Sequence, residues 1–380
     1  MRRRHWLGRC AALGLGGGRF GGAWAARAAP GHRQGAQSQA AQSATAMALW
    51  GYHPWWMRED WRRRDLSLFD RVSLFEIEIG AEGQLVDLQG WPGRWAALLA
   101  AMRAHGAALD VVVFLSDAAR FERVFGDAGR RERLLGELRA LGEAADGVQL
   151  DVEVYDPLSQ PARRGYHDLC ARLHSALQAL PGGRLLSAFG PVGAAVDLYD
   201  RRMLASIDRL VVQGYDAHHA GSRRAGPVAP LRGPHPFNWG SALQHYLALG
   251  WPRQRLLMSL PYFGYEWPTA SATPGALATG AALQTSYAPV DAQLLPRIRI
   301  SAREEATRHG LKRDPVSGSP YYVFRDADGG WHQGWFEDEV SLGAKLAFVR
   351  EERLAGAALF PLGYDGGAFE PLLRRSRQGR

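Results

Sequence analysis

The sequence predicts an α/β protein built on a (β/α)₈ barrel, with an insertion between the seventh and eighth strands. Two observations carry this prediction: short β-rich runs recur along the chain, and longer stretches with helical patterns lie between them. Strands that alternate with helices pair in parallel through βαβ crossovers, and eight such units in about 325 residues suit a closed barrel. A doubly wound sheet is the alternative architecture.

The predicted strands are short, and longer segments of mixed polarity separate them. They are Ala48–Trp56, Arg71–Ile79, Leu109–Ser116, Val148–Tyr155, Arg184–Gly190, Arg209–Tyr215, Arg255–Tyr262 and Ala357–Leu362. The predicted helices include Arg94–His105, Arg130–Ala145, Tyr166–Leu180 and Val340–Arg353. In the third helix, Leu169, Leu173 and Leu177 recur at helical spacing, which predicts one buried face.

Residues 268–339 form a segment too long for a single crossover helix. Within it, Tyr321–Arg325 and Trp331–Phe336 flank Asp328-Gly329, and Asp-Gly between β-rich runs favours a hairpin turn. We interpret the segment as an insertion on the barrel. Because loops at the carboxyl ends of barrel strands build the active site, we expect the insertion to wall one side of a cleft.

Charge and composition exclude several classes of protein. The apolar share of 46% excludes wholesale disorder, and no apolar run reaches the roughly 18 residues of a membrane span. The formal net charge is +8, but residues 1–33 hold seven arginines and residues 374–380 hold four, with no acid in either segment. The part between them is therefore net negative, which argues against a nucleic-acid partner. The missing apolar run argues against stable membrane insertion.

The chain begins with features of an export signal. Arg3-Arg4-His5-Trp6-Leu7 is similar to the bacterial twin-arginine pattern, and Ala26-Arg27-Ala28 suits signal cleavage. We predict an export signal at residues 1–29, a flexible linker at 30–47, the barrel at 48–373 and a basic tail at 374–380. The protein would then be periplasmic or secreted, and a disordered basic tail is the alternative for the first segment.

The strongest motif is the segment Asp146–Glu153, with the sequence DGVQLDVE. Side chains alternate on a strand, so Gln149, Asp151 and Glu153 share the inner face while the valines and leucine pack against helices. The two carboxyl groups would lie about 6–7 Å apart along the strand. Such proximity raises the pKa of one of them, which suits a general acid. A polar layer or ion pair inside the barrel is the alternative.

This segment resembles the DGxDxDxE signature of glycoside hydrolase family 18, the chitinases and their relatives. Other segments match the family in order across about residues 49–366: Asp208–Asp216 (DRLVVQGYD), Leu256–Trp267 (LLMSLPYFGYEW), and Glu337-Asp338 with Ser341, Lys345 and Leu346, followed by Gly356–Gly363 (GAALFPLG). The resemblance implies a retaining glycosidase that acts by substrate assistance without a cofactor.

The resemblance also implies roles for individual residues. Glu153 would protonate the glycosidic oxygen, Asp151 would orient the acetamido group of the sugar, and Tyr215 would donate its hydroxyl to the acetamido oxygen. Gln213 and Asp216 would line the same subsite. An amphipathic residue at the mouth of the barrel is the alternative for Tyr215 taken alone.

Two departures from the family pattern stand in the site. Gln149 replaces the usual aspartate, and it could still hydrogen-bond Asp151, so we expect activity with a changed pH dependence. Phe360 replaces the tryptophan that commonly floors the sugar, which leaves an apolar face of smaller area. These departures suggest a divergent branch, and they motivate an alternative: a non-catalytic glycan-binding protein on the same barrel.

Aromatic residues near the predicted strand ends form a second candidate set, because sugar rings pack their C–H faces on aromatic rings. These residues are Tyr52, Trp55, Trp56, Tyr262, Tyr265 and Trp267. Ordinary core packing is the alternative for each. His53 and the adjacent pair His218-His219 invite a metal site, but the pair lacks a clear third ligand. The two cysteines, Cys10 and Cys170, are too few for a disulfide scaffold or a cysteine zinc site. No metal site is predicted.

Together these features predict an exported bacterial glycosidase. Its partner would be a polysaccharide or oligosaccharide with β-linked N-acetylhexosamine, such as chitin oligomers or peptidoglycan.

Overall fold

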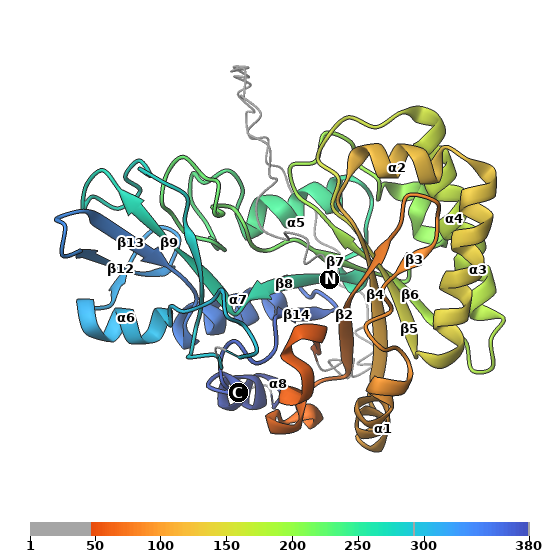
Figure 1. The fold of residues 1–380 in the computed structure, drawn as a ribbon, viewed down its shortest axis with the longest axis horizontal. Coiled ribbons are helices and arrows are strands. Elements are labelled where there is room, and N and C mark those ends of the chain that lie inside the picture. Colours follow the sequence, from red (N-terminus) through yellow and green to blue (C-terminus); the bar gives the residue numbers. More distant parts are fainter. Residues whose placement is uncertain (1–46, 292, 379–380) are drawn as a thin grey trace, which may run out of the picture. The chain divides into compact units, whose positions relative to one another are not determined.

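A closed parallel barrel and a second, antiparallel sheet make up the fold (Figure 1). The computed structural model describes residues 47–291 and 293–378. The predicted export signal, residues 30–46 of the predicted linker and the last two residues lie outside the described part of the chain.

Eight parallel strands form the barrel, as the sequence predicts. They are β1 (Ala48–Pro54), β2 (Arg71–Ile79), β4 (Ala108–Leu115), β5 (Gly147–Val152), β6 (Leu185–Gly190), β7 (Arg209–Val212), β8 (Leu256–Pro261) and β14 (Gly356–Phe360). Neighbouring strands pair in the order β1-β14-β8-β7-β6-β5-β4-β2, and pairing of β1 with β2 closes the ring. The predicted (β/α)₈ barrel is therefore confirmed, and a doubly wound open sheet is excluded.

Helices cover the outside of the barrel, although not every crossover is α-helical. The α-helices of this part are α1 (Ala96–Ala104), α2 (Ala118–Phe125), α3 (Ala128–Ala144), α4 (Gln160–Gln178), α5 (Trp239–Ala248), α7 (Glu339–Glu351) and α8 (Glu370–Arg377). Short 3₁₀ helices are η1 (Trp55–Arg63), η2 (Leu66–Leu68), η3 (Gly93–Trp95), η4 (Arg201–Ala205) and η5 (Arg253–Arg255). The β1–β2 and β6–β7 crossovers contain only 3₁₀ helices. None of the described helices combines the length and apolarity that a bilayer span needs.

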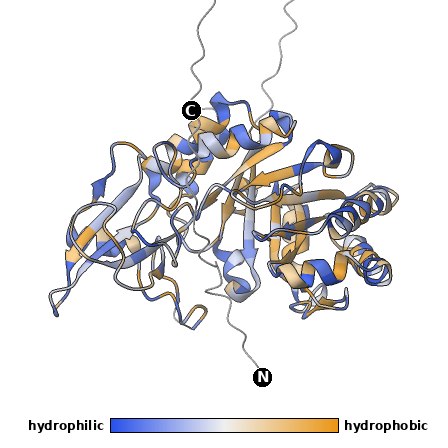
Figure 2. Cartoon of the chain, turned by 90° about the horizontal axis from the view of Figure 1, so that it is seen from above, coloured by the Kyte–Doolittle hydropathy of each residue, from blue (hydrophilic) through white to orange (hydrophobic). Residues whose placement is uncertain are grey.

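The pattern of apolar residues explains how helices and strands pack. The barrel strands are mostly hydrophobic, and the helices present polar residues outward (Figure 2). In α4, Leu169, Leu173 and Leu177 are all buried, as their spacing predicts. Polar caps define where helices begin: Asp117 accepts the backbone N–H of Arg120 in α2, and Asn238 forms a capping box with Ser241 in α5.

The same hydrogen bond, from a strand backbone N–H to an aspartate carboxylate, recurs at the amino ends of the barrel strands. Asp70 Oδ2 accepts the backbone N–H of Leu49 at 2.8 Å, Asp146 Oδ2 accepts that of Leu109 at 3.0 Å, and Asp208 Oδ2 accepts that of Leu186 at 2.9 Å. Each aspartate stands just before one strand and binds the first residues of a preceding one. Asp146 therefore acts at the end of the barrel opposite the acid pair of its own motif.

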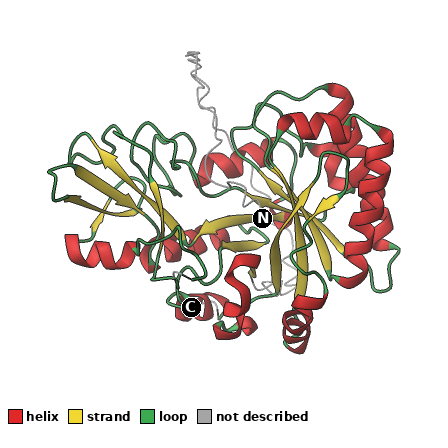
Figure 3. Ribbon diagram, viewed as in Figure 1, coloured by secondary structure: helices red, strands yellow, loops and turns green. Residues whose placement is uncertain are grey.

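The insertion forms the second sheet (Figure 3). Its strands pair in the order β10-β9-β13-β12-β11: β9 is Phe263–Thr269, β10 is Leu283–Ser286, β11 is Lys312–Arg313, β12 is Pro320–Arg325 and β13 is Trp331–Trp335. The predicted hairpin is confirmed as β12 and β13, and helix α6 (Ala302–His309) packs against it. The sheet starts at Phe263, earlier than the expected 268, because the chain enters β9 directly after β8. A short strand, β3 (Leu85–Val86), pairs antiparallel with β2.

The expected basic tail at 374–380 is in part helical, which differs from the sequence-based expectation. Arg374 and Arg377 lie in the last turns of α8. Arg374 pairs with Asp65 at 2.6 Å, and Arg377 pairs with Asp70 at 3.0 Å. Their charges are thus used to attach α8 to the start of the barrel.

Candidate active site

Two acids at the carboxyl end of β5 form the centre of the site. Gln149, Asp151 and Glu153 share one face of the strand, and Asp151 is only 4% exposed. The strand ends at Val152, and Glu153 follows it, with its backbone N–H bound to Leu115 O at 2.9 Å. The side chains of Asp151 and Glu153 are joined by a hydrogen bond. The predicted pair is therefore assembled on the inner face of the barrel.

Burial gives this pair its acid–base character. Desolvation, followed by the charge of Asp216, raises the pKa of Glu153 to about 7. Desolvation, followed by the charge of Glu153, raises the pKa of Asp151 well above its usual range. Asp151 is buried and Glu153 is half-buried, and carboxyl groups this close titrate as one system, so the pair retains a proton near neutral pH. That proton can reach either member through their shared hydrogen bond.

Gln149 has a different partner from the one the sequence suggested. Its amide nitrogen donates to Ser187 Oγ on β6 at 3.1 Å, and the side chain is fully buried. The hydroxyl of Tyr52, on β1, lies near Gln149 and Asp151 inside the barrel. The neutral amide of Gln149 thus connects β5 to β6 below the acid pair, and it contributes no charge to the acid pair.

A hydrogen-bond network supports Glu153 from the neighbouring strands. The hydroxyl of Tyr155 contacts the Glu153 carboxyl group and donates to Gln213 Oε1 at 3.2 Å. Gln213 Oε1 also accepts the backbone N–H of Val192 at 2.7 Å. Gln213 is 4% exposed, so its oxygen orients Tyr155, which in turn contacts Glu153. Tyr155 was not predicted as a site residue, although it ends the predicted strand and the alternation that places Glu153 on the inner face extends to it.

Tyr215 and Asp216 follow β7 and complete the cluster. Tyr215 is half-buried, and after desolvation the charge of Glu153 is the main influence that raises the pKa of its hydroxyl. Asp216 is also half-buried, and its backbone lies in the left-handed region at φ 66°, where a short polar residue is tolerated. Burial raises the pKa of Asp216 to about 7. The cluster therefore brings two acids of β5 and two residues after β7 to one point.

Gly214 fixes the approach of Tyr215. Its N–H donates to Ser259 Oγ at 2.9 Å, and its carbonyl accepts from Trp239 Nε1 at 2.8 Å. A Cβ atom at this position would stand 2.0 Å from the carbonyl oxygen of Ser259. Only glycine therefore fits here, and the backbone before Tyr215 is held from both sides.

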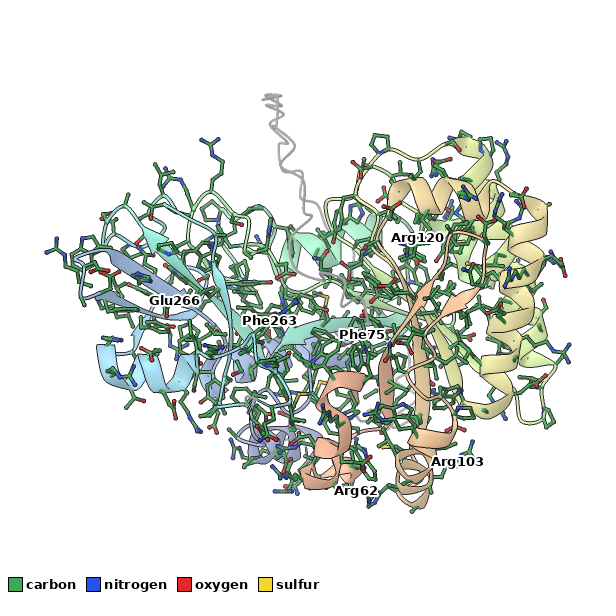
Figure 4. The ribbon with its side chains drawn as sticks, viewed as in Figure 1. Arg62, Phe75, Arg103, Arg120, Phe263 and Glu266 are labelled. Atoms are coloured by element: carbon green, nitrogen blue, oxygen red, sulfur yellow. The ribbon has the colours of Figure 1, made fainter. Side chains whose placement is uncertain are left out.

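Aromatic rings line the cluster from several strands. Phe360, at the end of β14, stacks on Tyr215 with centroids 6.0 Å apart and lies 4.9 Å from Phe75 and 5.8 Å from Tyr52. Phe263 packs edge-on against Tyr215 at 5.4 Å. Figure 4 shows Phe75 among the barrel strands and Phe263 between the barrel and the second sheet. These rings form an apolar floor beside the acids; Phe75, Phe263 and Phe360 are 3–8% exposed, so Phe360 and the half-buried Tyr215 offer what ring area can receive the C–H face of a sugar.

The structure separates the other predicted aromatic residues into two groups. Trp55 packs edge-on against Trp56, which contacts Phe75 at 6.0 Å, so both border the floor. Trp267 is fully buried in the second sheet, and no part of it is available to a ligand.

Tyr262 is also misplaced for sugar stacking. It is 2% exposed and packs against Phe369 at 5.0 Å, near the C-terminal helix. Tyr262 and Trp267 therefore contribute to packing, which corrects the expectation that they contact a sugar.

Other polar groups do not form a metal centre. His53 is 1% exposed and contacts the carbonyl of Arg58, and His218 contacts the carbonyl of Pro227. Burial lowers the pKa of both imidazoles to about 4. Across residues 47–291 and 293–378, no three acidic, histidine or cysteine side chains are grouped as metal ligands.

A closed parallel barrel with an acid pair at the carboxyl end of one strand defines a (β/α)₈-barrel protein with the arrangement of an enzyme active site. The chain belongs to glycosyl hydrolases family 18, whose family model matches residues 115–365.

Similar proteins place the chain within this family. It is 28% identical over 237 residues to a protein named as a sporulation-specific glycosylase, YdhD, of Bacillus subtilis, covering 60% of this chain and 50% of that protein. It is 24% identical over 223 residues to the cortical fragment-lytic enzyme of B. subtilis, covering 56% of this chain and 43% of that enzyme. The chain thus spans about half the length of these relatives.

A solved structure shares the fold. The family 18 chitinase from Cycas revoluta, in complex with allosamidin, superposes with a TM-score of 0.72 over 87% of this chain and 99% of the chitinase. The identity is 19%, so this likeness concerns the fold.

Proposed function

We propose that the protein hydrolyses glycans that contain β-linked N-acetylhexosamine, with retention of configuration, by substrate-assisted catalysis. The observation that carries this proposal is the hydrogen-bonded pair of the buried Asp151 and the half-buried Glu153 beside Tyr215. The pair holds a proton near neutral pH, and an apolar floor lies beside it. Family membership supports the same chemistry, because this family is an exception to the use of a protein nucleophile.

In the first step, Glu153 gives its proton to the glycosidic oxygen. The carbonyl oxygen of the sugar's own acetamido group attacks the anomeric carbon, and the bond to the leaving sugar breaks. Asp151 binds the acetamido N–H and stabilises the cationic oxazolinium ring, while the Tyr215 hydroxyl donates to the acetamido oxygen. Asp151 and Tyr215 thus hold the attacking group in line.

In the second step, the Glu153 carboxylate removes a proton from water. The water oxygen forms a bond to the anomeric carbon, and the bond to the acetamido oxygen breaks. Glu153 regains its proton, so the cycle consumes only water. Two successive inversions at one carbon give net retention.

The test begins with purified protein and two substrate sets: N-acetylchitooligosaccharides and peptidoglycan glycan strands. We expect products from at least one set, with the β-anomer formed first by NMR. A thiazoline mimic of the oxazolinium ring should inhibit competitively. Formation of the α-anomer first, or no inhibition at high concentration, would show a different mechanism.

The variant Glu153→Gln removes the proton donor and keeps the shape of the side chain. We expect turnover to fall by about 10²–10⁴-fold in a protein that remains folded by circular dichroism. Glu78→Gln is a matched control, because Glu78 is an exposed acid that pairs with Arg120 at 3.4 Å. Unchanged turnover in Glu153→Gln would remove this residue from the mechanism.

The alternative function is glycan binding without hydrolysis, for which the neutral Gln149 and the small floor residue Phe360 are the motivation. The same incubations decide between the two: products identify an enzyme, and saturable binding without products identifies a lectin. Both acids of the pair are present, which favours the enzyme.

We also propose that the protein is exported, with residues 1–29 as a cleaved signal. Support comes from the twin-arginine-like Arg3-Arg4 and the Ala26-Arg27-Ala28 site. The test is cell fractionation of a bacterium expressing the chain. Replacement of Arg3 and Arg4 by lysine should retain the protein in the cytoplasm, and unchanged export would contradict the proposal.

A further inference from the structure

Glu76 is a buried acid at the end of β2 that has no part in the mechanism above. Its side chain is 7% exposed. It follows Phe75, whose ring lies 4.9 Å from Phe360 in the apolar floor. The register between β2 and β4 shifts between Leu74 and Ile77, and irregularities of this kind redirect side chains at the rims of barrels. The shift explains why simple alternation along β2 does not locate Glu76.

The electrostatic neighbours of Glu76 place it at the same centre as the acid pair. Within the described residues, the charges that act on it come from Glu78 and Glu153, and its own charge acts on Asp151. Arg120 pairs with Glu78 at the exposed rim. Burial, followed by these like charges, raises the pKa of Glu76 to about 8. At neutral pH the carboxyl group is therefore mainly protonated and can donate a hydrogen bond.

The hydrogen bonding of Glu76 is incomplete. Its Oε2 atom is buried and has no hydrogen-bond partner in the described part of the chain. Other buried acids also leave one oxygen without a partner among the described residues, but their second oxygen is bonded: Glu337 pairs with Lys345, although its Oε1 is unpartnered. Glu266 accepts from the Tyr322 hydroxyl at 2.6 Å. A buried polar atom without a partner is destabilising, so a group of this kind beside a binding site is explained if the ligand supplies the partner.

We propose that Glu76 contacts the substrate, and that its buried carboxyl group hydrogen-bonds an oxygen atom of the glycan held at Asp151 and Glu153. This inference rests on the proposed function, since it requires a glycan bound at Asp151 and Glu153. A neutral carboxyl group both donates and accepts, which matches a sugar hydroxyl or an amide oxygen. A site of this kind discriminates against a sugar that lacks the oxygen, because Glu76 would stay unpaired. Glu76 would thus contribute to the choice of sugar.

Two variants of Glu76 test the proposal, one that retains the hydrogen bond to the glycan and one that removes it. Glu76→Gln keeps a neutral donor of the same shape, and Glu76→Leu removes the hydrogen bond while filling the space. We measure KM and kcat, and calorimetric binding of tetra-N-acetylchitotetraose and of a peptidoglycan tetrasaccharide in a Glu153→Gln background. Glu78→Gln is the control, on the same strand but exposed.

We expect Glu76→Gln and Glu78→Gln to bind within about 3-fold of the parent protein, and Glu76→Leu to bind about 10- to 100-fold more weakly. The loss should appear in KM more than in kcat. Equal binding by Glu76→Leu, with or without a change in melting temperature, would overturn the inference. A glutamine variant as weak as the leucine variant would also overturn it, as would tighter binding of a deacetylated oligosaccharide, which would identify an ionised Glu76 paired with an ammonium group.

The two proposals fail in different ways. If the wild-type protein cleaves a glycan and Glu76→Leu matches it, only the role of Glu76 is wrong. If the wild-type protein neither cleaves nor binds either substrate set, the proposed function is wrong, and the contact of Glu76 with a glycan is wrong with it.

Discussion

The hydroxyl of Tyr265, on β9 of the second sheet, donates to Asp216 Oδ1 at 3.1 Å. Asp216 follows a barrel strand and acts electrostatically on Glu153. The insertion therefore does more than flank the barrel, because one of its strands supplies a hydrogen bond to an acid of the site.

Removal of this bond should change the pH profile of the reaction. In Tyr265→Phe the ionised form of Asp216 loses a donor, so its pKa rises above about 7. The negative charge that raises the pKa of Glu153 is then partly lost, and the pKa of Glu153 falls. Since Glu153 must be protonated to act, the alkaline limb of kcat against pH should move to lower pH. Tyr321→Phe, on β12, is the matched control, and an identical profile in Tyr265→Phe would refute the coupling.

Stability should decrease as pH rises from 5 to 9. The pKa values of Glu76, Asp216 and Glu153 are raised in the folded protein to about 8, 7 and 7. Above the unfolded pKa values of 4.5 for the two glutamates and 3.8 for Asp216, the folded state binds more protons, so the free energy of unfolding falls with pH until each folded pKa is passed. Each such group contributes a slope of about 1.4 kcal/mol per pH unit. Urea denaturation at pH 5, 7 and 9 measures this slope, and Glu76→Gln should reduce it.

The pair Lys345–Glu337 should be essential for folding stability. The two groups are 2.6 Å apart and almost fully buried, at 1% and 0% side-chain exposure. Lys345→Met leaves Glu337 buried without its cation, which costs about 3–5 kcal/mol. The double variant Lys345→Met, Glu337→Gln should recover much of this loss. Glu59→Gln breaks an exposed pair with Arg62 and should change stability by less than about 1 kcal/mol. Denaturation midpoints distinguish these outcomes.

The periodicity of the sequence was sufficient to predict the barrel. Each predicted strand overlaps an observed one, because runs such as Val148–Tyr155 combine β-branched residues with flanking turns. The observed strands β5 and β7 end at Val152 and Val212, before the predicted ends. This places Glu153 and Tyr215 just beyond regular pairing, where side chains can converge from different strands.

The acid pair was predictable because its residues are local in sequence, whereas the surrounding contacts are not. The floor contains Phe75 and Phe263, which approach Phe360 only after the barrel closes. Glu76 was missed because a register shift redirects it, and alternation cannot detect such a shift. Trp267 was misjudged because the sequence places an aromatic residue near a strand end but does not show whether a second sheet covers the ring or solvent reaches it.

Asp70 links the beginning and the end of the folded barrel. Its Oδ2 atom accepts the N–H of Leu49 at the start of β1 and also binds Arg377 in α8, at 2.8 and 3.0 Å. The two ends of the barrel are thus neighbours in space, which is the condition for circular permutation. A short linker from α8 to β1, with new termini at the Asp328-Gly329 hairpin turn, would preserve every barrel strand while moving the ends of the polypeptide to the second sheet.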